Sequence, residues 1–252
     1  MVASTAIRFG CTMCGGCCHN LNLPLTLDET VGWVESGGRV DIYCEADVWT
    51  EPLAGEDGRR AHRERRSFAT RSGTLPVRVT VIFAGAVEGA CHNLRADFKC
   101  GAYERRPLVC RIYPAEINPF IQLDPAQKIC PPEAWASGDL IALGGKPAST
   151  QVQQWIEQSR QTDQNDAPYK SLVCKELGIN VTAVHGQGFV RYRPDARQLV
   201  EAIQSARKQD ALGFHSEWSV CVPRTDAGEA LKSQGAAVTA NIATPQYLYL
   251  RA

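Results

Sequence analysis

Hydrophobic and polar positions in the first third of the chain predict one helix and one strand. Thr26 is followed three residues later by Glu29, with acidic residues in the first turn, which is the signature of a capped helix. We expect this helix to end by the Gly37-Gly38 pair. From Leu75 to Ala84 the chain is rich in β-branched residues with partial alternation, which predicts a strand closed by Gly85.

The last hundred residues alternate helical and extended patterns. Helices are predicted over residues 149–159 and 169–177, after Pro194, and near residues 227–232. Extended stretches are predicted over residues 181–192, where glycines break the pattern, and over residues 218–222 and 237–250. This alternation predicts a mixed α/β C-terminal half and an α+β fold for the whole chain.

The intervening region is polar and rich in proline. Residues 51–73 carry six arginines between Arg59 and Arg71 and read as an exposed loop or a short helix. Residues 91–132 combine cysteines with prolines at a density that disfavours regular helix or sheet. We therefore expect an irregular, cysteine-rich metal-binding domain over residues 1–135 and an α/β domain of unknown role over residues 148–252. One continuous fold is the alternative.

Composition and charge argue against nucleic-acid binding, membrane association and a disulfide-linked fold. The 252 residues carry 27 basic and 27 acidic side chains, so no global field favours nucleic acid or a membrane surface. The chain shows neither a signal-peptide pattern nor a long apolar span, which predicts a cytoplasmic protein that does not enter a membrane. In a reducing compartment, an odd set of 11 cysteines is more consistent with metal ligands than with disulfides; a secreted, disulfide-linked form is the alternative.

The cysteines fall into a dense N-terminal run and a later group. The run is Cys11-Thr-Met-Cys14-Gly-Gly-Cys17-Cys18, and its first three cysteines have the spacing of a bacterial ferredoxin. The candidate metal ligands are Cys11, Cys14, Cys17, Cys18, Cys91, Cys100, Cys110 and Cys130. These eight would fill two four-thiolate sites, or one site with spare thiols, and the adjacent Cys17 and Cys18 are hard to direct at one small ion.

These residues resemble a known family. Phe9-x-Cys11-x2-Cys14-Gly-x-Cys17-Cys18 and the later motif Cys100-x2-Tyr-x2-Arg-Pro-x2-Cys110-Arg-x-Tyr-Pro resemble the zinc- or iron-chelating cysteine-cluster family named for its CxxCxxCC motif, the YkgJ-like proteins. The resemblance covers roughly residues 7–131. It implies a bound iron–sulfur cluster or zinc, because the family is loosely described as Fe–S oxidoreductases. It also implies a relation to flagellin lysine-N-methylase.

We favour an iron–sulfur centre, with [4Fe–4S] first and zinc as the alternative, because clustered thiolates and a Cys130-Pro131 pair suit it. The predicted activity is electron transfer or cluster-assisted oxidoreductase chemistry on a small-molecule or protein substrate, with an electron-transfer partner. The alternatives are a zinc-stabilised binding module and a methyltransferase. The catalytic candidates are Arg106, Arg111 and Tyr113, whose other interpretation is a loop pinned by arginine hydrogen bonds.

The remaining histidines and cysteines near these motifs have two interpretations. His19 and His92 each follow a cysteine, so either is a metal ligand or an imidazole that lies at the surface or only supports the site. Cys44, Cys174 and Cys221 lie outside the motifs and are expected to be buried apolar side chains.

Overall fold

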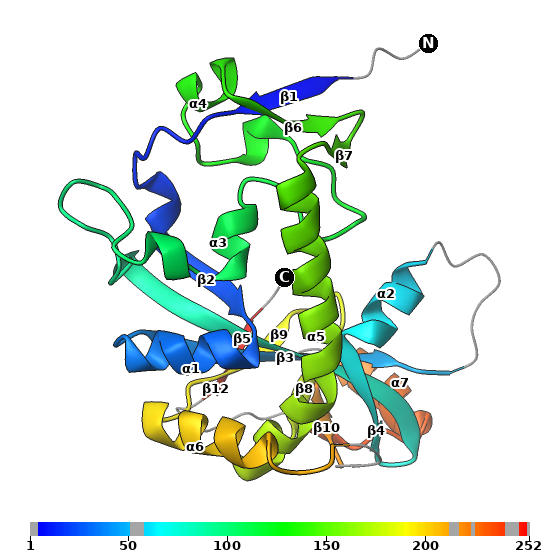
Figure 1. Ribbon diagram of the computed structural model, residues 1–252. Coiled ribbons are helices and arrows are strands. Elements are labelled where there is room, and N and C mark those ends of the chain that lie inside the picture. Colours follow the sequence, from blue (N-terminus) through cyan, green and yellow to red (C-terminus); the bar gives the residue numbers. More distant parts are fainter. Residues whose placement is uncertain (1–4, 51–57, 212–216, 223–224, 240–246, 251–252) are drawn as a thin grey trace. The chain divides into compact units, whose positions relative to one another are not determined.

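The computed structural model describes residues 5–50, 58–211, 217–222, 225–239 and 247–250. These residues form seven α-helices and two β-sheets, so the predicted mixed fold class is confirmed. The chain divides into two compact units (Figure 1). The first contains the residues up to Leu25 and Gly85–Thr162, and the second contains Thr26–Ala84 and the residues from Asp163 onward. Each unit combines separate stretches, and independent folding of residues 1–135 stays a prediction.

The first unit is built from short elements. They are β1 (Ala6–Phe9), the 3₁₀ turn η1 (Gly16–Cys18), β2 (His19–Leu25), η2 (Tyr103–Arg105), α3 (Leu108–Ile112), η3 (Pro125–Gln127), α4 (Glu133–Ala136), β6 (Asp139–Leu143) and β7 (Lys146–Pro147). β1, β6 and β7 form an antiparallel sheet. The start of α5 (Thr150–Glu176) supplies Ile156, which packs on Leu108 and Ile112 of α3. This small apolar cluster fixes α3 in the unit.

The second unit is built on a mixed sheet. Its elements are α1 (Leu27–Glu35), β3 (Arg39–Val48), α2 (Arg59–Arg65), β4 (Ser67–Ser72), β8 (Val181–Val184), β9 (Phe189–Tyr192), α6 (Ala196–Ala206), β10 (Ser219–Cys221), α7 (Thr225–Ser233), β11 (Val238–Thr239) and β12 (Tyr247–Leu250). The neighbouring strands β11, β10, β8 and β3 are parallel, whereas β9 pairs antiparallel with β3 and β12. Helices α1 and α6 lie side by side (Figure 1).

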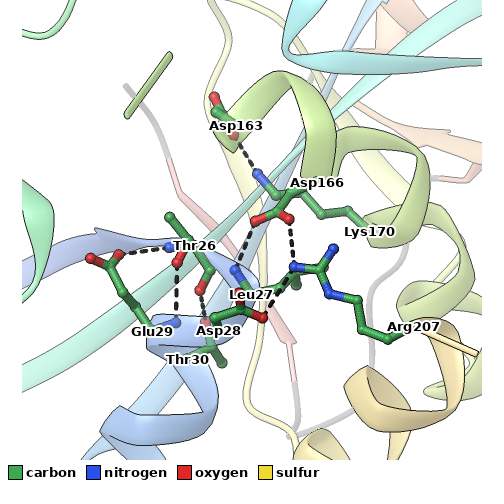
Figure 2. A network of polar contacts seen from close by, with 9 residues as sticks. All are labelled: Thr26, Leu27, Asp28, Glu29, Thr30, Asp163, Asp166, Lys170 and Arg207. Carbon is green, nitrogen blue, oxygen red and sulfur yellow. Dashed lines mark hydrogen bonds and ion pairs between the residues drawn. The ribbon is translucent and has the colours of Figure 1, made fainter. Parts of the chain in front are cut away.

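The capped helix is confirmed. Thr26 and Glu29 form the expected capping box, in which each side chain accepts the other residue's backbone N–H. Asp166 of α5, only 1% exposed, accepts the N–H of Leu27 at 2.8 Å and the Arg207 guanidinium at 2.8 Å (Figure 2). A buried carboxylate at the positive end of a helix is favourable when it is also paired in this way.

Two elements differ from the sequence prediction. Gly85 does not end the strand, because β5 continues over Leu75–Ala90, where Asn20 of β2 accepts the N–H of Gly89 at 2.8 Å. Thr150–Glu176 forms the single helix α5 instead of the two helices predicted over residues 149–159 and 169–177. As predicted, glycines break the extended stretch over residues 181–192, which forms two strands, β8 and β9, on either side of them. Of the predicted strand at 237–250, only β11 and β12 are described, since residues 240–246 lie outside the described ranges.

The missed continuity of α5 has a physical cause. The middle of this helix buries charged side chains instead of apolar ones, so no hydrophobic period marks it. Lys170 is only 3% exposed, and its ammonium lies 2.5 Å from a carboxylate oxygen of Asp163. Arg66 donates to the other oxygen of Asp163 at 2.6 Å. Ion pairing therefore allows charged side chains to be buried on the inner face of the helix, where the sequence pattern usually shows apolar residues.

The arginine-rich segment and the other cysteines also have defined places. Residues 59–71 form α2 and most of β4, and Arg63 pairs with Asp47 at 3.2 Å, so the segment is more than a solvated loop. Cys44, Cys174 and Cys221 are buried, as predicted. No helix in the described part of the chain is long and apolar enough to cross a membrane.

Candidate metal centre

All eight candidate ligands lie in the first unit, on four separate segments. Cys11 and Cys14 are exposed, and the other six are partly buried. Most of them lie on turns and loops, as the proline density predicts, although Cys110 lies on the short helix α3. The fold therefore gathers thiols that are up to about 120 residues apart in sequence.

The first segment is a tight turn around Gly15 and Gly16. Gly15 has φ +70°, a conformation that glycine adopts without strain, and its carbonyl accepts the N–H of Cys18 at 2.9 Å. A Cβ built on Gly15 would lie 3.3 Å from Leu94 and Phe98, so these side chains pack directly on the turn. Cys17 and Cys18 lie in η1, and their side chains are hydrogen-bonded to each other.

The second segment is a hairpin-like loop that contains Cys91 and Cys100. The N–H of Cys91 donates to the carbonyl of Cys18 at 2.7 Å, which joins this loop to the first segment. Within the loop, Leu94 donates to the carbonyl of Cys91 at 2.8 Å and forms an antiparallel bridge with Cys100. Backbone hydrogen bonds therefore hold Cys18, Cys91 and Cys100 in one neighbourhood.

The third segment places Cys110 on α3, which packs against β2, the strand that begins immediately after Cys18. Burial of Leu108 and Ile112 anchors this helix, each side chain contributing about 1.5–3 kcal/mol. Arg111 donates to the carbonyls of Arg106 and Glu104, at 3.0 and 2.8 Å. The arginine thus stabilises the loop before α3.

The fourth segment carries Cys130. Its Sγ lies 3.6 Å from the hydroxyl of Tyr113, which also accepts the N–H of Ile129 at 3.3 Å. The N–H of Gly10 donates to Ala134 at 2.8 Å, and the rings of Phe9 and Trp135 lie 5.0 Å apart. These contacts bring the end of β1, and with it Cys11, to the segment that follows Cys130.

The pKa values of the thiols reflect how closely they are grouped. A hydrogen bond from Cys18 lowers the pKa of Cys17 to about 6, and the Arg106 guanidinium favours the same thiolate. That hydrogen bond, burial, and the charges of Cys17, Cys91 and Cys100 raise the pKa of Cys18.

The other buried thiols resist ionisation. Burial, followed by the charges of Cys17, Cys100 and Cys91, raises the pKa of Cys110 to about 12. Burial also raises the pKa of Cys130, whose thiol neighbours are Cys17, Cys14 and Cys11. A metal must therefore displace protons from these thiols when it binds.

The other candidates have specific partners. Arg106 stacks over the Tyr103 ring at 4.0 Å, beside Cys17. Burial and the neighbouring Cys130 raise the pKa of Tyr113, so its hydroxyl keeps its proton at neutral pH. His19 Nδ1 faces the Gly15 carbonyl at 3.0 Å and must donate to it, because a carbonyl can only accept. His92 Nε2 contacts the Asn93 side chain at 3.0 Å.

The cysteine sulfurs are suitable ligands for a soft metal, but in this structure they are not arranged around a common point. Eight sulfur atoms are the ligand type that zinc and iron–sulfur clusters prefer. Within the described ranges, no three His, Cys, Asp or Glu side chains are arranged to hold a metal ion. The thiols therefore have to shift toward one another to coordinate one, and loops, a glycine turn and a five-residue helix carry them.

Sequence reasoning missed the apolar side chains around the thiols. Met13, Phe98 and Ile129 are 47%, 59% and 61% exposed. A Cβ built on Gly16 would lie 3.5 Å from Cys14 Sγ and 3.9 Å from Ile129. Met13 and Ile129 each stand next to a cysteine in the sequence, which could have indicated that they lie near the thiols. No such sequence signal exists for Phe98, because its contact with Gly15 forms only in the folded loop.

Residues 10–131 match the family model CxxCxxCC, described as "Putative zinc- or iron-chelating domain". No curated protein and no solved structure matches the chain. The match includes all eight candidate cysteines and confirms the resemblance indicated by the two motifs.

Proposed function

Because residues 10–131 match the CxxCxxCC model of zinc- or iron-chelating domains, we propose that the protein holds a thiolate-ligated iron–sulfur centre, most simply [4Fe–4S], in the cytoplasm. It uses this centre in electron transfer or in cluster-assisted oxidoreductase chemistry. The observation that carries the proposal is the gathering of eight thiols from four segments of one unit. Sets of four thiolates are the usual ligands of such clusters.

A bound cluster supplies one-electron redox chemistry, and the surrounding side chains adjust it. The Arg106 guanidinium lies beside Cys17 and balances negative charge on the thiolates. The Tyr113 hydroxyl lies 3.6 Å from Cys130 and can donate to that sulfur once it is deprotonated. Hydrogen bonds to ligand sulfurs raise cluster potentials, so Tyr113 acts here as a positioning and tuning residue.

The partner in this proposal is an electron-transfer protein that docks over the thiols. Among the described residues, the large hydrophobic side chains with high exposure are Met13, Phe98, Tyr103, Ile121, Ile129 and Leu143, and all six belong to the first unit. Exposed apolar side chains gathered near a site mark an interaction surface. Cys11 and Cys14 are exposed in the same unit, which gives a partner access to the centre.

Elemental analysis of protein purified without oxygen tests the proposal. We expect about four iron and four acid-labile sulfide ions for each filled centre, with visible absorbance that bleaches on reduction. Cys14→Ser and Cys110→Ser should lower both contents, whereas Cys221→Ala, a buried thiol of the second unit, should leave them unchanged. Protein without iron and sulfide, however the variants behave, would refute the iron–sulfur assignment.

A zinc-stabilised binding module is the second candidate. The observation that favours it is the shortness of the elements around the thiols, since η1, η2 and η3 have three residues each and α3 has five. Such segments bury little apolar surface, and structural zinc commonly replaces the missing core. Zinc near one or two equivalents, without visible absorbance, would support this candidate.

A further inference from the structure

We infer that the turn around Phe98 anchors a docking surface for a protein partner whose contact face is acidic. This Phe98 surface consists of exposed apolar side chains with basic side chains around them: Met13, Phe98, Tyr103, Arg95, Lys99 and Arg105. The inference rests on the proposed electron-transfer function, which supplies the class of partner. It adds the side chain that enters the partner's apolar pocket and the sign of the charge around that pocket.

Phe98 is held in an unusual backbone conformation. Its φ is +61°, which is disfavoured for any residue with a Cβ, and its side chain is largely exposed. The N–H of Phe98 donates to the Arg95 carbonyl at 3.0 Å, and the N–H of Arg95 donates to the Lys99 carbonyl at 2.9 Å. Asp97 Oδ1 accepts the N–H of Lys99 at 3.2 Å. These hydrogen bonds fix an exposed aromatic ring at a position where glycine would be unstrained.

Two other exposed side chains lie on the backbone next to this turn. A Cβ built on Gly15 would lie 3.3 Å from Phe98 Cδ1, so the ring contacts the turn that follows Met13. Met13 also has a positive φ, +54°. Tyr103 follows Gly101, whose N–H is hydrogen-bonded to the same loop as Phe98. Methionine and aromatic side chains are the types enriched at protein interfaces, so these three form the apolar centre of the surface.

Basic side chains predominate around the apolar centre. Between residues 95 and 106 the chain carries four basic and two acidic side chains. The Arg95 side chain is 62% exposed, and Lys99 and Arg105 are exposed as well. Asp97 lies 3.4 Å from Arg95, which balances that acidic charge within the turn. An acidic face on the partner complements the charge that remains and steers its approach.

A protein fits this surface better than a nucleic acid or a membrane does. The carboxylates of Asp97 and Glu104 stand among the basic residues and repel closely spaced phosphates. The formal net charge of zero gives the chain no long-range attraction to an anionic polymer or lipid surface. An aromatic ring has few rotatable bonds, so fixing it in a partner's pocket costs little conformational entropy.

Calorimetric binding of purified electron carriers to the full chain, prepared without oxygen, tests the inference. The acidic probes are a plant-type ferredoxin and a flavodoxin, and the basic probe is cytochrome c. We expect at least one acidic carrier to bind, with an affinity that falls about tenfold between roughly 20 and 200 mM salt. Cytochrome c should bind about tenfold more weakly than that carrier, because its charge is not complementary.

Replacing Phe98 by glycine separates docking from a structural role. Phe98→Gly removes the ring and relieves the backbone strain, so affinity for the acidic carrier should fall about tenfold or more. The urea midpoint should stay at or above that of the wild type, and the metal content should not change. Lys99→Glu should weaken binding about three- to tenfold, mainly through slower association. The matched reversal Lys146→Glu, on β7 and outside the Phe98 surface, should change the affinity less than about twofold.

Three results would overturn the inference: no binding of either acidic carrier, equal or tighter binding of cytochrome c, or equal affinities for the wild type and Phe98→Gly. A joint loss of urea midpoint and metal content in Phe98→Gly would show a structural role and would also refute it. Tighter binding to phosphatidylglycerol vesicles or to single-stranded DNA than to the acidic carriers would exclude a protein partner. Absence of iron and sulfide, in contrast, would refute the iron–sulfur function and leave the binding measurement unaffected.

Discussion

Replacing Asp166 by alanine should destabilise the second unit far more than replacing Asp28 by asparagine, although both carboxylates contact the same guanidinium. Arg207 lies 2.8 Å from Asp166 and 3.2 Å from Asp28 (Figure 2). The two side chains differ in burial, since that of Asp166 is 1% exposed and that of Asp28 is 85% exposed. The two carboxylates therefore differ in burial and in partners, because Asp166 also accepts the N–H of Leu27.

The expected losses in unfolding free energy follow from the hydrogen-bonding groups that each substitution leaves without a partner. Asp166→Ala removes a charge-assisted hydrogen bond to Arg207 and leaves the buried N–H of Leu27 without its acceptor, which together cost about 3–5 kcal/mol. Asp166→Asn retains an acceptor for Leu27 and should cost about 1–2 kcal/mol. Asp28→Asn weakens an exposed ion pair and a favourable charge in the first turn of α1, at a cost below about 1 kcal/mol.

Urea unfolding followed by tryptophan fluorescence measures these differences, because Trp33 of α1 is buried. The predicted order of unfolding free energies is wild type, Asp28→Asn, Asp166→Asn and Asp166→Ala, from most to least stable. If Asp166→Ala and Asp28→Asn unfold within about 0.5 kcal/mol of each other, the reasoning from burial is wrong.

Acid and backbone changes give further predictions. Burial would raise the pKa of Asp163, but Lys170 and Arg66 outweigh it and lower the pKa. The stabilisation is therefore complete above the unfolded-state pKa of about 3.9 and is lost as pH falls through the folded-state value. Asp163→Asn should cost less at pH ~2 than at pH 7 by urea midpoints; an equal cost would contradict this assignment. Gly138→Ala, at φ +106° against the backbone after β1, should cost about 2–4 kcal/mol and lower metal content. Gly32→Ala, with open space around it in α1, is its control and should be neutral or stabilising by up to about 1 kcal/mol; equal losses for both would refute the steric argument.

Local signals were sufficient where neighbours in sequence determine the structure. Thr26 and Glu29 lie three residues apart and fix the start of α1 without help from the rest of the fold. The sequence pattern did not predict that α5 is continuous, because Lys170 is buried through its pairing with Asp163. The spacing of hydrophobic residues does not reveal such buried ion pairs.

The cysteines show the same division between local and long-range information. Their types and spacings indicate the resemblance to the CxxCxxCC family model, because the motifs are short and contiguous. Which thiols lie together depends on the hydrogen bond between Cys91 and Cys18 and on the packing of α3 against β2. Those contacts join residues that are about 70 or more positions apart, which no local pattern encodes.

The long excursion between Cys18 and Cys91 also bears on the order of events during biosynthesis. Residues 26–84, which belong to the second unit, are translated before Cys91, whose N–H donates to the Cys18 carbonyl. Cys130 is translated later still. At about 5–20 residues per second, a ribosome needs on the order of 6–20 s to travel from Cys18 to Cys130. Under the proposed function, the full set of eight candidate ligands exists only after Cys130 has been translated. Filling of the complete site would therefore follow synthesis of the first 130 residues.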